Sequence, residues 1–246
     1  MPNSIFKDEK GEKAVQYRHE LKHDITTSDM IAIRQRMRAI AVPDSHAIDG
    51  KYLIRSLYFD TPTDKALFEK QNGVSRRQKF RIRYYNGDKS VIHLEKKCKV
   101  GGLGLKVSAN LTEDQAKWIV DGDISWMMDS PDELVKELYT HMVTENLAPK
   151  VIVDYTREPF IYRPGNVRVT LDYNIRTGLS NTDFLNTECV TIPAALGICI
   201  MEVKWDNFLP EIIRDAVQLP YGRTGSFSKY EACREPMITP GVLSYN

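Results

Sequence analysis

The sequence contains few of the residues that mark several large classes of proteins. Only 4 of its 246 residues are cysteines, at Cys98, Cys189, Cys199 and Cys233. This spacing excludes a CxxC zinc motif and argues against a disulfide framework. The longest weakly apolar run, near 190–203, is interrupted by proline and is shorter than the roughly 20 residues that a membrane helix needs. We therefore expect a cytoplasmic protein without a membrane segment.

Neither sign of charge dominates the chain. It has 34 lysines and arginines against 33 aspartates and glutamates, which gives a formal net charge of +1. No global basic excess attracts the chain to nucleic acid or to an anionic membrane, so recognition of an anion must be local. The GxxxxGK[ST], GxGxxG, HRD and DFG motifs are also absent, which excludes the P-loop, Rossmann and kinase modes of phosphate binding.

Eight segments have the length and alternation of β-strands. They cover approximately residues 15–23, 52–60, 78–86, 90–98, 103–109, 150–158, 166–173 and 197–205. Capping residues and helical spacing of apolar side chains predict helices at 26–41, between Pro62 and Gly73, at 113–121 and 131–146, and more weakly at 210–218. Thr61, Thr112 and Ser130 are the expected caps of three of these helices. The pattern predicts an α+β fold, mainly antiparallel β, with helices in the connections.

Charged side chains recur two residues apart in six of the predicted strands. Because side chains alternate along a strand, Lys79, Arg81 and Arg83 share one face of QKFRIRYY. Any single strand of this kind can be the solvated face of an ordinary sheet. Recurrence in six strands favours instead a sheet closed into a barrel of about eight strands, with the charges inside.

The candidate inward positions hold nine basic residues and four acidic ones. They are Lys22, Arg81, Arg83, Lys97, Lys106, Arg157, Arg168, Lys204 and Lys229, against Glu20, Glu95, Asp172 and Glu202. Such an excess is strongly destabilising when it is buried without counterions, so the pattern predicts a polyanionic ligand. Arginine forks suit phosphate oxygens, and carboxylates are the ligands that Mg²⁺ or Mn²⁺ requires. Together these residues predict a site for polyphosphate and a metal.

The ordered motifs match those of a known family. They include YRHELK (17–22), KFRIRYY (79–85), HLEKK (93–97), VDYTRE (153–158), MEVKW (201–205) and FSKY (227–230). In this order the chain resembles the VTC domain of the vacuolar transporter chaperone polyphosphate polymerases, a branch of the triphosphate tunnel metalloenzymes or CYTH superfamily. The resemblance covers about residues 15–232. Residues 1–14 are expected to be frayed or disordered, and residues 233–246 to form a tail.

The resemblance implies an eight-stranded tunnel barrel that binds ATP or polyphosphate with Mn²⁺ or Mg²⁺. It implies phosphate binding by Lys22, Arg81, Arg83, Lys97, Lys106, Arg157, Ser228 and Lys229, a hydrogen bond from Tyr155 and a metal on Glu202. Arg168 and Lys204 lie in the matching strands with less defined contacts. The superfamily motif is Glu-x-Glu-x-Lys, but Arg18 stands at its first position here. Glu20 is therefore expected to be either a metal ligand or an ion-pair partner of Lys22.

The expected reaction is transfer of the ATP γ-phosphate to a growing polyphosphate chain. Phosphoryl transfer depends mainly on positioning and charge neutralisation, for which Arg81, Arg83, Arg157, Lys204 and metal-bound Glu202 are the candidates. With water as acceptor the same site is a tri- or polyphosphatase, and without catalysis it is a receptor for polyphosphate. The expected ligands are ATP, polyphosphate or pyrophosphate. RNA is less favoured because no aromatic platform is interleaved with the basic residues.

Overall fold

The computed structural model describes residues 18–100, 103–219 and 227–238 of the chain. The segment 1–14 that is expected to be frayed lies outside the described residues. The eight predicted strands are present and form one antiparallel sheet, in the order β1-β10-β8-β7-β3-β4-β5-β6. Their bounds are β1 His19–Ile25, β3 Tyr52–Asp60, β4 Arg76–Tyr85, β5 Asp88–Val100, β6 Leu103–Leu111, β7 Ala148–Tyr162, β8 Val167–Thr177 and β10 Cys199–Trp205.

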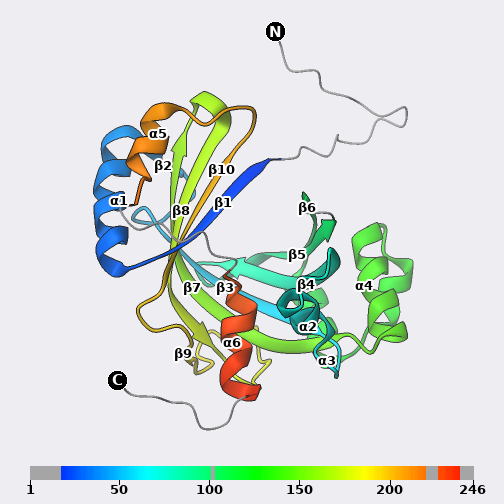
Figure 1. Ribbon diagram of the computed structural model, residues 1–246. Helices are drawn as coiled ribbons and strands as arrows, with labels where there is room; N and C mark the ends of the chain where they lie inside the picture. The colour runs from blue at the N-terminus through cyan, green and yellow to red at the C-terminus, as the bar shows by residue number, and fades with distance from the viewer. Residues whose placement is uncertain (1–17, 101–102, 220–226, 239–246) are drawn as a thin grey trace, which may run out of the picture.

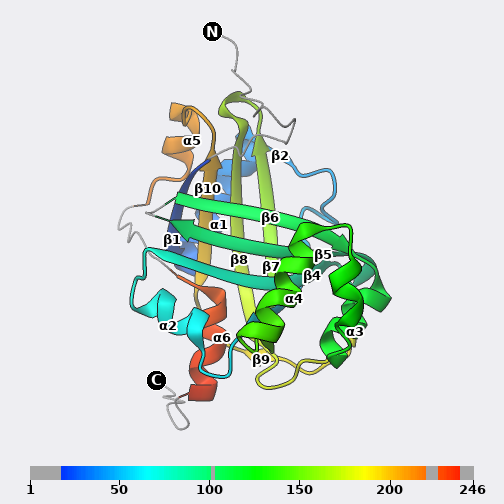
Figure 2. The same ribbon diagram turned by 90° about the vertical axis from the view of Figure 1, so that its right-hand side faces the viewer.

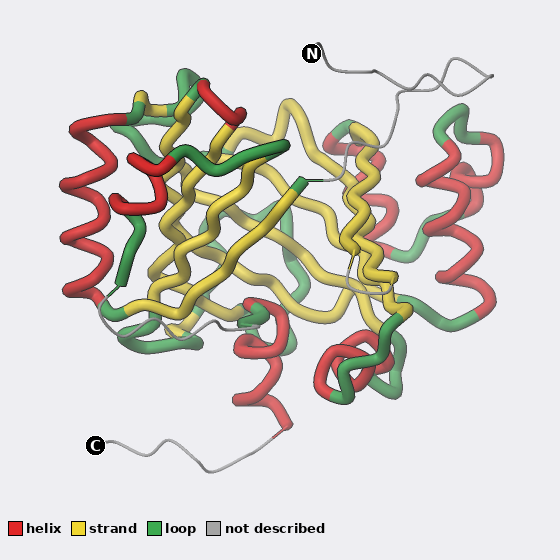
Figure 3. The backbone as a smooth tube through the Cα atoms, turned by 45° about the horizontal axis from the view of Figure 1, so that its top comes forward, coloured by secondary structure: helices red, strands yellow, loops and turns green. Residues whose placement is uncertain are grey.

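The sheet curls into a half-barrel, which confirms the predicted fold class (Figures 1 and 3). β7 joins its two halves, because this long strand pairs with β3 on one side and β8 on the other. The end strands are β1 and β6, and no backbone pairing joins them within the described residues. Two short strands are added outside this path, where β2 (Val42–Pro43) pairs with β7 and β9 (Ile192–Pro193) with β8.

Helices cover the outer face of each half of the sheet (Figures 1 and 2). The half with β8 and β10 packs against α1 (Thr27–Ile40) and α5 (Glu211–Ala216) in one apolar core. The half with β4, β5 and β6 packs against α3 (Glu113–Asp121) and α4 (Glu133–Thr144) in another. Two 3₁₀ helices complete the connections, η1 (Ser125–Asp129) and η2 (Pro164–Asn166). Among the described residues, no helix is long and apolar enough to span a lipid bilayer.

Two of the predicted helix starts differ from those in the structure. At α3 the expected capping box is confirmed, because Oγ1 of Thr112 accepts a hydrogen bond from the N–H of Gln115 and Oε1 of Gln115 accepts one from the N–H of Thr112. At α4 the expected cap Ser130 is wrong. Asp132 is the N-cap and accepts from the N–H of Leu134, while Ser130 accepts from the N–H of Asp132. Ser130 and Asp132 lie two residues apart, and Asp132, which is nearer the helix, is the N-cap.

Asp60 ties α2 (Lys65–Gln71) and α6 (Lys229–Ile238) to the end of β3. Its carboxylate accepts from the N–H groups of Ala66 and Leu67, and from the hydroxyl of Tyr230 on α6. Thr61, the predicted cap of α2, precedes the actual N-cap, Asp64. These bonds fix the start of α6 against the concave side of the sheet (Figure 1). The sequence did not predict α6, which includes the first residues of the expected tail, 233–246; the residues after 238 lie outside the described residues.

Candidate phosphate-binding lumen

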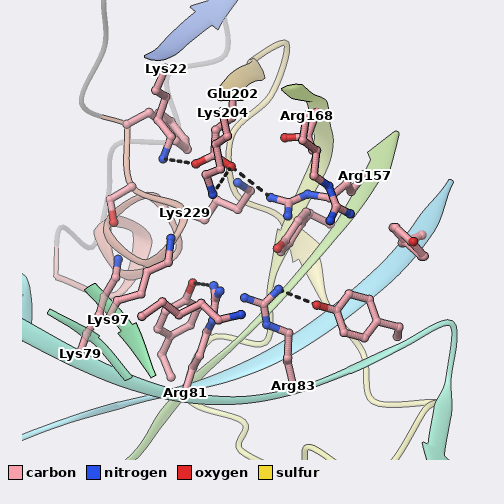
Figure 4. A pocket seen from close by; sticks show the side chains of 18 of the residues that line it. Lys22, Lys79, Arg81, Arg83, Lys97, Arg157, Arg168, Glu202, Lys204 and Lys229 are labelled. Carbon is pink, nitrogen blue, oxygen red and sulfur yellow. Dashed lines mark hydrogen bonds and ion pairs between the residues drawn. The ribbon is translucent and has the colours of Figure 1, made fainter. Parts of the chain in front are cut away.

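The concave face of the half-barrel encloses a strongly basic cavity of about 250 Å³ (Figure 4). Eleven basic side chains line it, and Glu202 is the acidic residue among its described lining. Every residue that the sequence analysis proposed for phosphate binding is part of this lining, although the residues come from distant segments. The basic residues are Arg18, Lys22, Lys79, Arg81, Arg83, Lys97, Lys106, Arg157, Arg168, Lys204 and Lys229, with Tyr155 and Ser228 among them.

Cross-strand register brings these side chains together. Lys22 on β1 lies directly opposite Glu202 on β10. Arg157 on β7 lies opposite Asp172 on β8, and Arg81 on β4 lies opposite Glu95 on β5. Residues paired in this way point to the same face with their Cβ atoms roughly 5 Å apart. The alternation that predicts a charged face thus becomes a set of cation and carboxylate pairs inside the curl.

Glu95 is the centre of the first charged group. Its carboxylate accepts hydrogen bonds from Nε and Nη2 of Arg81 at 2.9 and 2.7 Å, from Nη2 of Arg83, and from Nζ of Lys106 at 2.6 Å. The residue is only 2% exposed. Burial alone would raise the pKa of Glu95, but the charges of Arg81 and Lys106 outweigh it and lower the pKa. One ionised carboxylate therefore holds three cations in fixed positions.

Asp172 is the centre of a second group on the facing wall. Arg157 forms a bidentate pair with it through Nε and Nη2, both at 2.7 Å, and Nζ of Lys229 donates at 2.6 Å. Burial disfavours the charged carboxylate, but the charges of Arg157 and Lys229 lower the pKa of Asp172 to about 2. Lys229 begins α6, next to Ser228, so this group also fixes the start of that helix at the lumen. A helix N-terminus is a favourable place for an anion.

Glu202 lies between cations from three strands (Figure 4). Its carboxylate oxygens are 3.3 Å from Nζ of Lys204 and 3.8 Å from both Nζ of Lys22 and Nη2 of Arg157. These distances are longer than those around Glu95 and Asp172, so Glu202 is held less tightly. Glu20 lies beside it at the exposed rim and outside the cavity lining, 3.9 Å from Lys22. Burial and a hydrogen bond to Glu202 raise the pKa of Glu20.

The carboxylates of Glu202 and Glu20 fit a divalent cation whose remaining ligands are phosphate oxygens and water. The described residues contain no cluster of three or more histidine, cysteine, aspartate or glutamate side chains that could hold a metal. Mg²⁺ and similar ions are commonly bound through one or two carboxylates, with phosphate oxygens and water as the remaining ligands. Glu202 and Glu20 supply the two carboxylates, and their shared hydrogen bond is the contact that a cation would replace.

Tyrosine rings support the cations of the lumen, and the sequence analysis overlooked two of them. The guanidinium of Arg81 lies 5.5 Å from the ring centroid of Tyr58 and donates to its hydroxyl at 2.7 Å. The guanidinium of Arg83 lies 5.7 Å from the ring centroid of Tyr85 and donates to its hydroxyl at 3.0 Å. Each pair combines a cation-π contact with a hydrogen bond. Tyr58 could have been found, because it lies at an alternate position of β3 and pairs with Arg81.

Several buried polar atoms of the lumen have no hydrogen-bond partner within the described structure. They are Nε of Arg83, Nε of Arg168 and Oγ1 of Thr170, a lining residue that the sequence analysis missed. Buried donors and acceptors are nearly always satisfied in folded proteins. Arg168 does bind Asp44 through Nη2 at 3.0 Å. All three residues line the lumen.

Lys79 also lines the lumen, although it was not counted among the inward cations. Burial and the charges of Arg81 and other cations lower the pKa of Lys79 to about 7. Burial lowers the pKa of Lys97 to about 7 as well. The signal for Lys79 was its position two residues before Arg81 on the same face of β4.

Comparison with known proteins agrees with this architecture. A search of curated sequences finds no match. A candidate adenylyl cyclase from Hippeastrum, described as having a dominant triphosphatase activity, is similar with a TM-score of 0.52 and 12% identity, over 92% of this chain and 98% of that chain. A candidate adenylate cyclase from Bacillus halodurans is similar with a TM-score of 0.49 and 14% identity, over 82% and 86%. The Hippeastrum likeness is one of fold. The sequence profile of the VTC domain matches residues 17–238, and the chain therefore belongs to the VTC domain family.

Proposed function

We propose that the lumen carries out metal-dependent phosphoryl transfer on ATP or polyphosphate, and that the reaction is synthesis of polyphosphate from the ATP γ-phosphate. The observation that carries this proposal is the convergence of eleven basic side chains on one cavity, in which Glu202 is the acidic residue of the described lining. An empty cavity of this charge is unfavourable, and a chain of phosphates would neutralise it along its length. The VTC domain family match and the tunnel-like fold support the same class of reaction.

The arginines are arranged to orient phosphate oxygens. Glu95 holds Arg81 and Arg83, and Asp172 holds Arg157, so the three guanidinium groups are fixed before a ligand arrives. Fixed donors aimed at the oxygens of a transferring phosphoryl group stabilise its charge without reorganisation during the reaction. The looser contacts of Lys204 to Glu202 leave its ammonium able to follow the charge as it moves.

Glu202, with Glu20 beside it, would hold Mn²⁺ or Mg²⁺. The triphosphate tunnel metalloenzymes, which this chain resembles, depend on divalent metals. When bound, such an ion neutralises charge on phosphate oxygens and orients them. The side chains of Lys22, Lys204 and Arg157 surround the same carboxylate. They would bind phosphate oxygens beside that carboxylate.

A second candidate function is hydrolysis of tri- or polyphosphate, with water in place of the phosphate acceptor. It is favoured by the structural likeness to the Hippeastrum protein, which is described as having a dominant triphosphatase activity. A receptor that binds polyphosphate without turnover would use the same cations. The three functions share the lumen and differ only in what happens to the γ-phosphate.

Product analysis separates these functions. The protein is incubated with ATP and Mn²⁺, and the products are resolved on a gel. A ladder of polyphosphate is expected, whereas orthophosphate alone identifies a phosphatase, and binding without product identifies a receptor. Glu202→Gln should abolish turnover but retain much of the affinity for tripolyphosphate, because the cations remain. The matched control is Glu188→Gln, at an exposed carboxylate outside the lumen, and turnover that survives Glu202→Gln would contradict the metal assignment.

A further inference from the structure

Lys79 and Lys97 form a pair of like charges where β4 and β5 line the lumen. They lie directly opposite each other on β4 and β5, and Lys106 is the next residue across, on β6. Like charges in this arrangement repel each other. Lys106 is paired with Glu95, but within the described residues neither Lys79 nor Lys97 has a carboxylate at ion-pair distance. This pair is therefore the part of the lumen where positive charge is least compensated.

The surroundings of Lys79 are cationic on every side that faces it. Arg81 on its own strand, Lys22 on β1, Lys229 on α6 and Lys70 on α2 all disfavour its protonated form. Its aromatic contact is the ring of Tyr58, 5.6 Å from Nζ. Figure 4 shows its ammonium beside that of Lys97, at the end of the lumen away from Arg83. A ligand with concentrated negative charge would relieve this repulsion directly.

The sign of the lining changes at the start of α6, where Phe227 and Ser228 line both the lumen and a second pocket. The charged residues of this second pocket are Asp24, Glu231 and Glu235 with Lys70. Lys70 is paired with Glu231 at 3.1 Å. An anionic chain that continued past Ser228 would therefore meet two further carboxylates, Asp24 and Glu235. The charge pattern favours an anion that stays within the lumen.

The lysine pair is also displaced from the arginines that we assign to the triphosphate. Lys79 lies two residues from Arg81 along β4 and four from Arg83, which corresponds to roughly 7 and 13 Å along a strand. Glu95 fixes Arg81, Arg83 and Lys106 in one group, and the lysine pair lies outside it. β4 thus presents two groups of cations to the lumen, separated along the strand.

We propose that Lys79 and Lys97 form a second subsite, which binds the terminal phosphate group of an inorganic phosphate acceptor beside the bound triphosphate. This inference rests on the proposed function and names its acceptor. A terminal phosphate carries more charge than an interior one and has three oxygens that two ammonium groups can share. In the transfer, an ionised oxygen of the acceptor forms a bond to the γ-phosphorus. The bond from that phosphorus to the bridging oxygen breaks, and ADP leaves with the electron pair.

Calorimetric titration tests whether the lumen binds two phosphate ligands at once. The protein is first saturated with β,γ-methylene ATP and Mg²⁺, and pyrophosphate or orthophosphate is then added in separate experiments. We expect pyrophosphate to bind the saturated protein, and Lys79→Met to weaken this second event about tenfold or more. The affinity for the ATP analogue should change by less than threefold. The relative affinities of the two added anions show which source of terminal phosphate the subsite prefers.

Three further variants make the test decisive. Lys79→Arg keeps the charge and should keep most of the pyrophosphate affinity. Lys117→Met removes an exposed lysine of α3, outside the lumen, and should change neither binding event. Lys79→Met should fold and melt at the same temperature as the natural protein or higher, because it removes repulsion. If Lys79→Met does not fold, Lys97→Met on β5 provides the same test.

The results distinguish the subsite from the function on which it rests. If pyrophosphate competes with the ATP analogue for one site, or if Lys79→Met weakens both ligands equally, the second subsite is wrong and the proposed function stands. If the analogue does not bind the natural protein at all, the proposed function itself fails and takes the subsite with it. Simultaneous binding that is lost on Lys79→Met and restored in Lys79→Arg supports the proposal.

Discussion

Two neighbouring groups of cations, one on β4 and β6 and the other on β4 and β5, have opposite electrostatic environments. Arg81, Arg83 and Lys106 surround the buried carboxylate of Glu95 and are fixed by it. Two residues away along β4 and β5, Lys79 and Lys97 lie opposite each other without a carboxylate partner in the described structure. The pKa of Glu95 is lowered by its cations, whereas the pKa of Lys79 is lowered to about 7 by burial and its cationic neighbours.

The comparison shows how one basic lumen can both hold a fixed geometry and remain open to ligand. A carboxylate among arginines organises the donors, but it also satisfies part of their charge. Cations without such a partner are costly in the empty protein, and their repulsion is relieved only when an anion binds. The first group therefore contributes to folding and orientation, and the second contributes mainly to ligand binding. The predictions below test this division.

The largest effect is expected from removing the shared carboxylate with Glu95→Gln. The buried guanidinium groups of Arg81 and Arg83 would then repel each other and the exposed ammonium of Lys106, which should reduce the free energy of unfolding by about 3–5 kcal/mol. Tripolyphosphate should restore part of this loss, because it supplies the missing negative charge and binds only the folded state. Urea unfolding with and without tripolyphosphate measures both effects, with Glu188→Gln as control. A variant as stable as the natural protein would show that Glu95 does not hold the group together.

The ion group around Asp172 predicts a pH dependence of the free energy of unfolding. Asp172 has a pKa of about 2 in the folded protein against 3.8 for a free aspartate. Its lowered pKa stabilises the fold above about pH 4, and this contribution is lost as the pH falls toward 2. The shift corresponds to about 2 kcal/mol. Between pH 5 and pH 2 the natural protein should therefore lose about 2 kcal/mol more than Asp172→Asn does, as measured by unfolding at each pH.

Other carboxylates also titrate in this range, so only the difference between the two proteins is informative. An Asp114→Asn variant, at an exposed position of α3, controls for a general change in charge. Parallel pH profiles for the natural protein and Asp172→Asn would contradict the assigned ion group with Arg157 and Lys229.

The lysine pair predicts that ligand binding is linked to proton uptake. With a pKa of about 7, Lys79 and Lys97 are largely neutral at pH 8 in the empty protein. A bound anion favours the charged forms, so protons are taken up and affinity falls as the pH rises. Each lysine should contribute about a fivefold loss of pyrophosphate affinity between pH 7 and pH 8, measured on protein saturated with the ATP analogue.

Calorimetry in two buffers of different ionisation enthalpy measures this uptake directly. Pyrophosphate binding to Lys79→Met should take up fewer protons and depend less on pH, although the ionisation of pyrophosphate itself is unchanged. Equal proton uptake by the natural protein and Lys79→Met would mean that Lys79 is already charged in the empty lumen.

Most of the sheet could be predicted from the sequence, because alternation of side chains is a local property of each strand. α6 could not, since the segment KYEACREPMI contains Pro236 and lacks an apolar stripe. This helix is held by contacts that depend on the folded sheet. Tyr230 packs on Tyr58 with ring centroids 5.2 Å apart and donates its hydroxyl to Asp60. The open edge between β1 and β6 also depends on the curvature of the whole sheet.

The basic residues of the site could be predicted for the same local reason, but their partners could not. Alternation places Glu95 and Asp172 on the inward face, and only cross-strand register assigns Arg81 to one and Arg157 to the other. Tyr58 carries no charge, so a search for charged faces passed over it. The same register places Arg81 opposite a carboxylate and Lys79 opposite another lysine, which separates the fixed cations from the uncompensated ones.

The smallest effect is expected at Tyr155, where the sequence predicted a hydrogen bond from the hydroxyl. In the structure its ring lies 5.5 Å from the guanidinium of Arg157 and 4.6 Å from Nζ of Lys229. Tyr155→Phe keeps this aromatic face, so polyphosphate affinity should change by less than about twofold. Tyr155→Leu removes it and should weaken binding about threefold or more, which is the range of a partly buried cation-π contact. If instead Tyr155→Phe reduced affinity tenfold in the same titration, the hydroxyl would be a phosphate donor, and the fixed wall of the lumen would contact the ligand through Tyr155 as well as its cations.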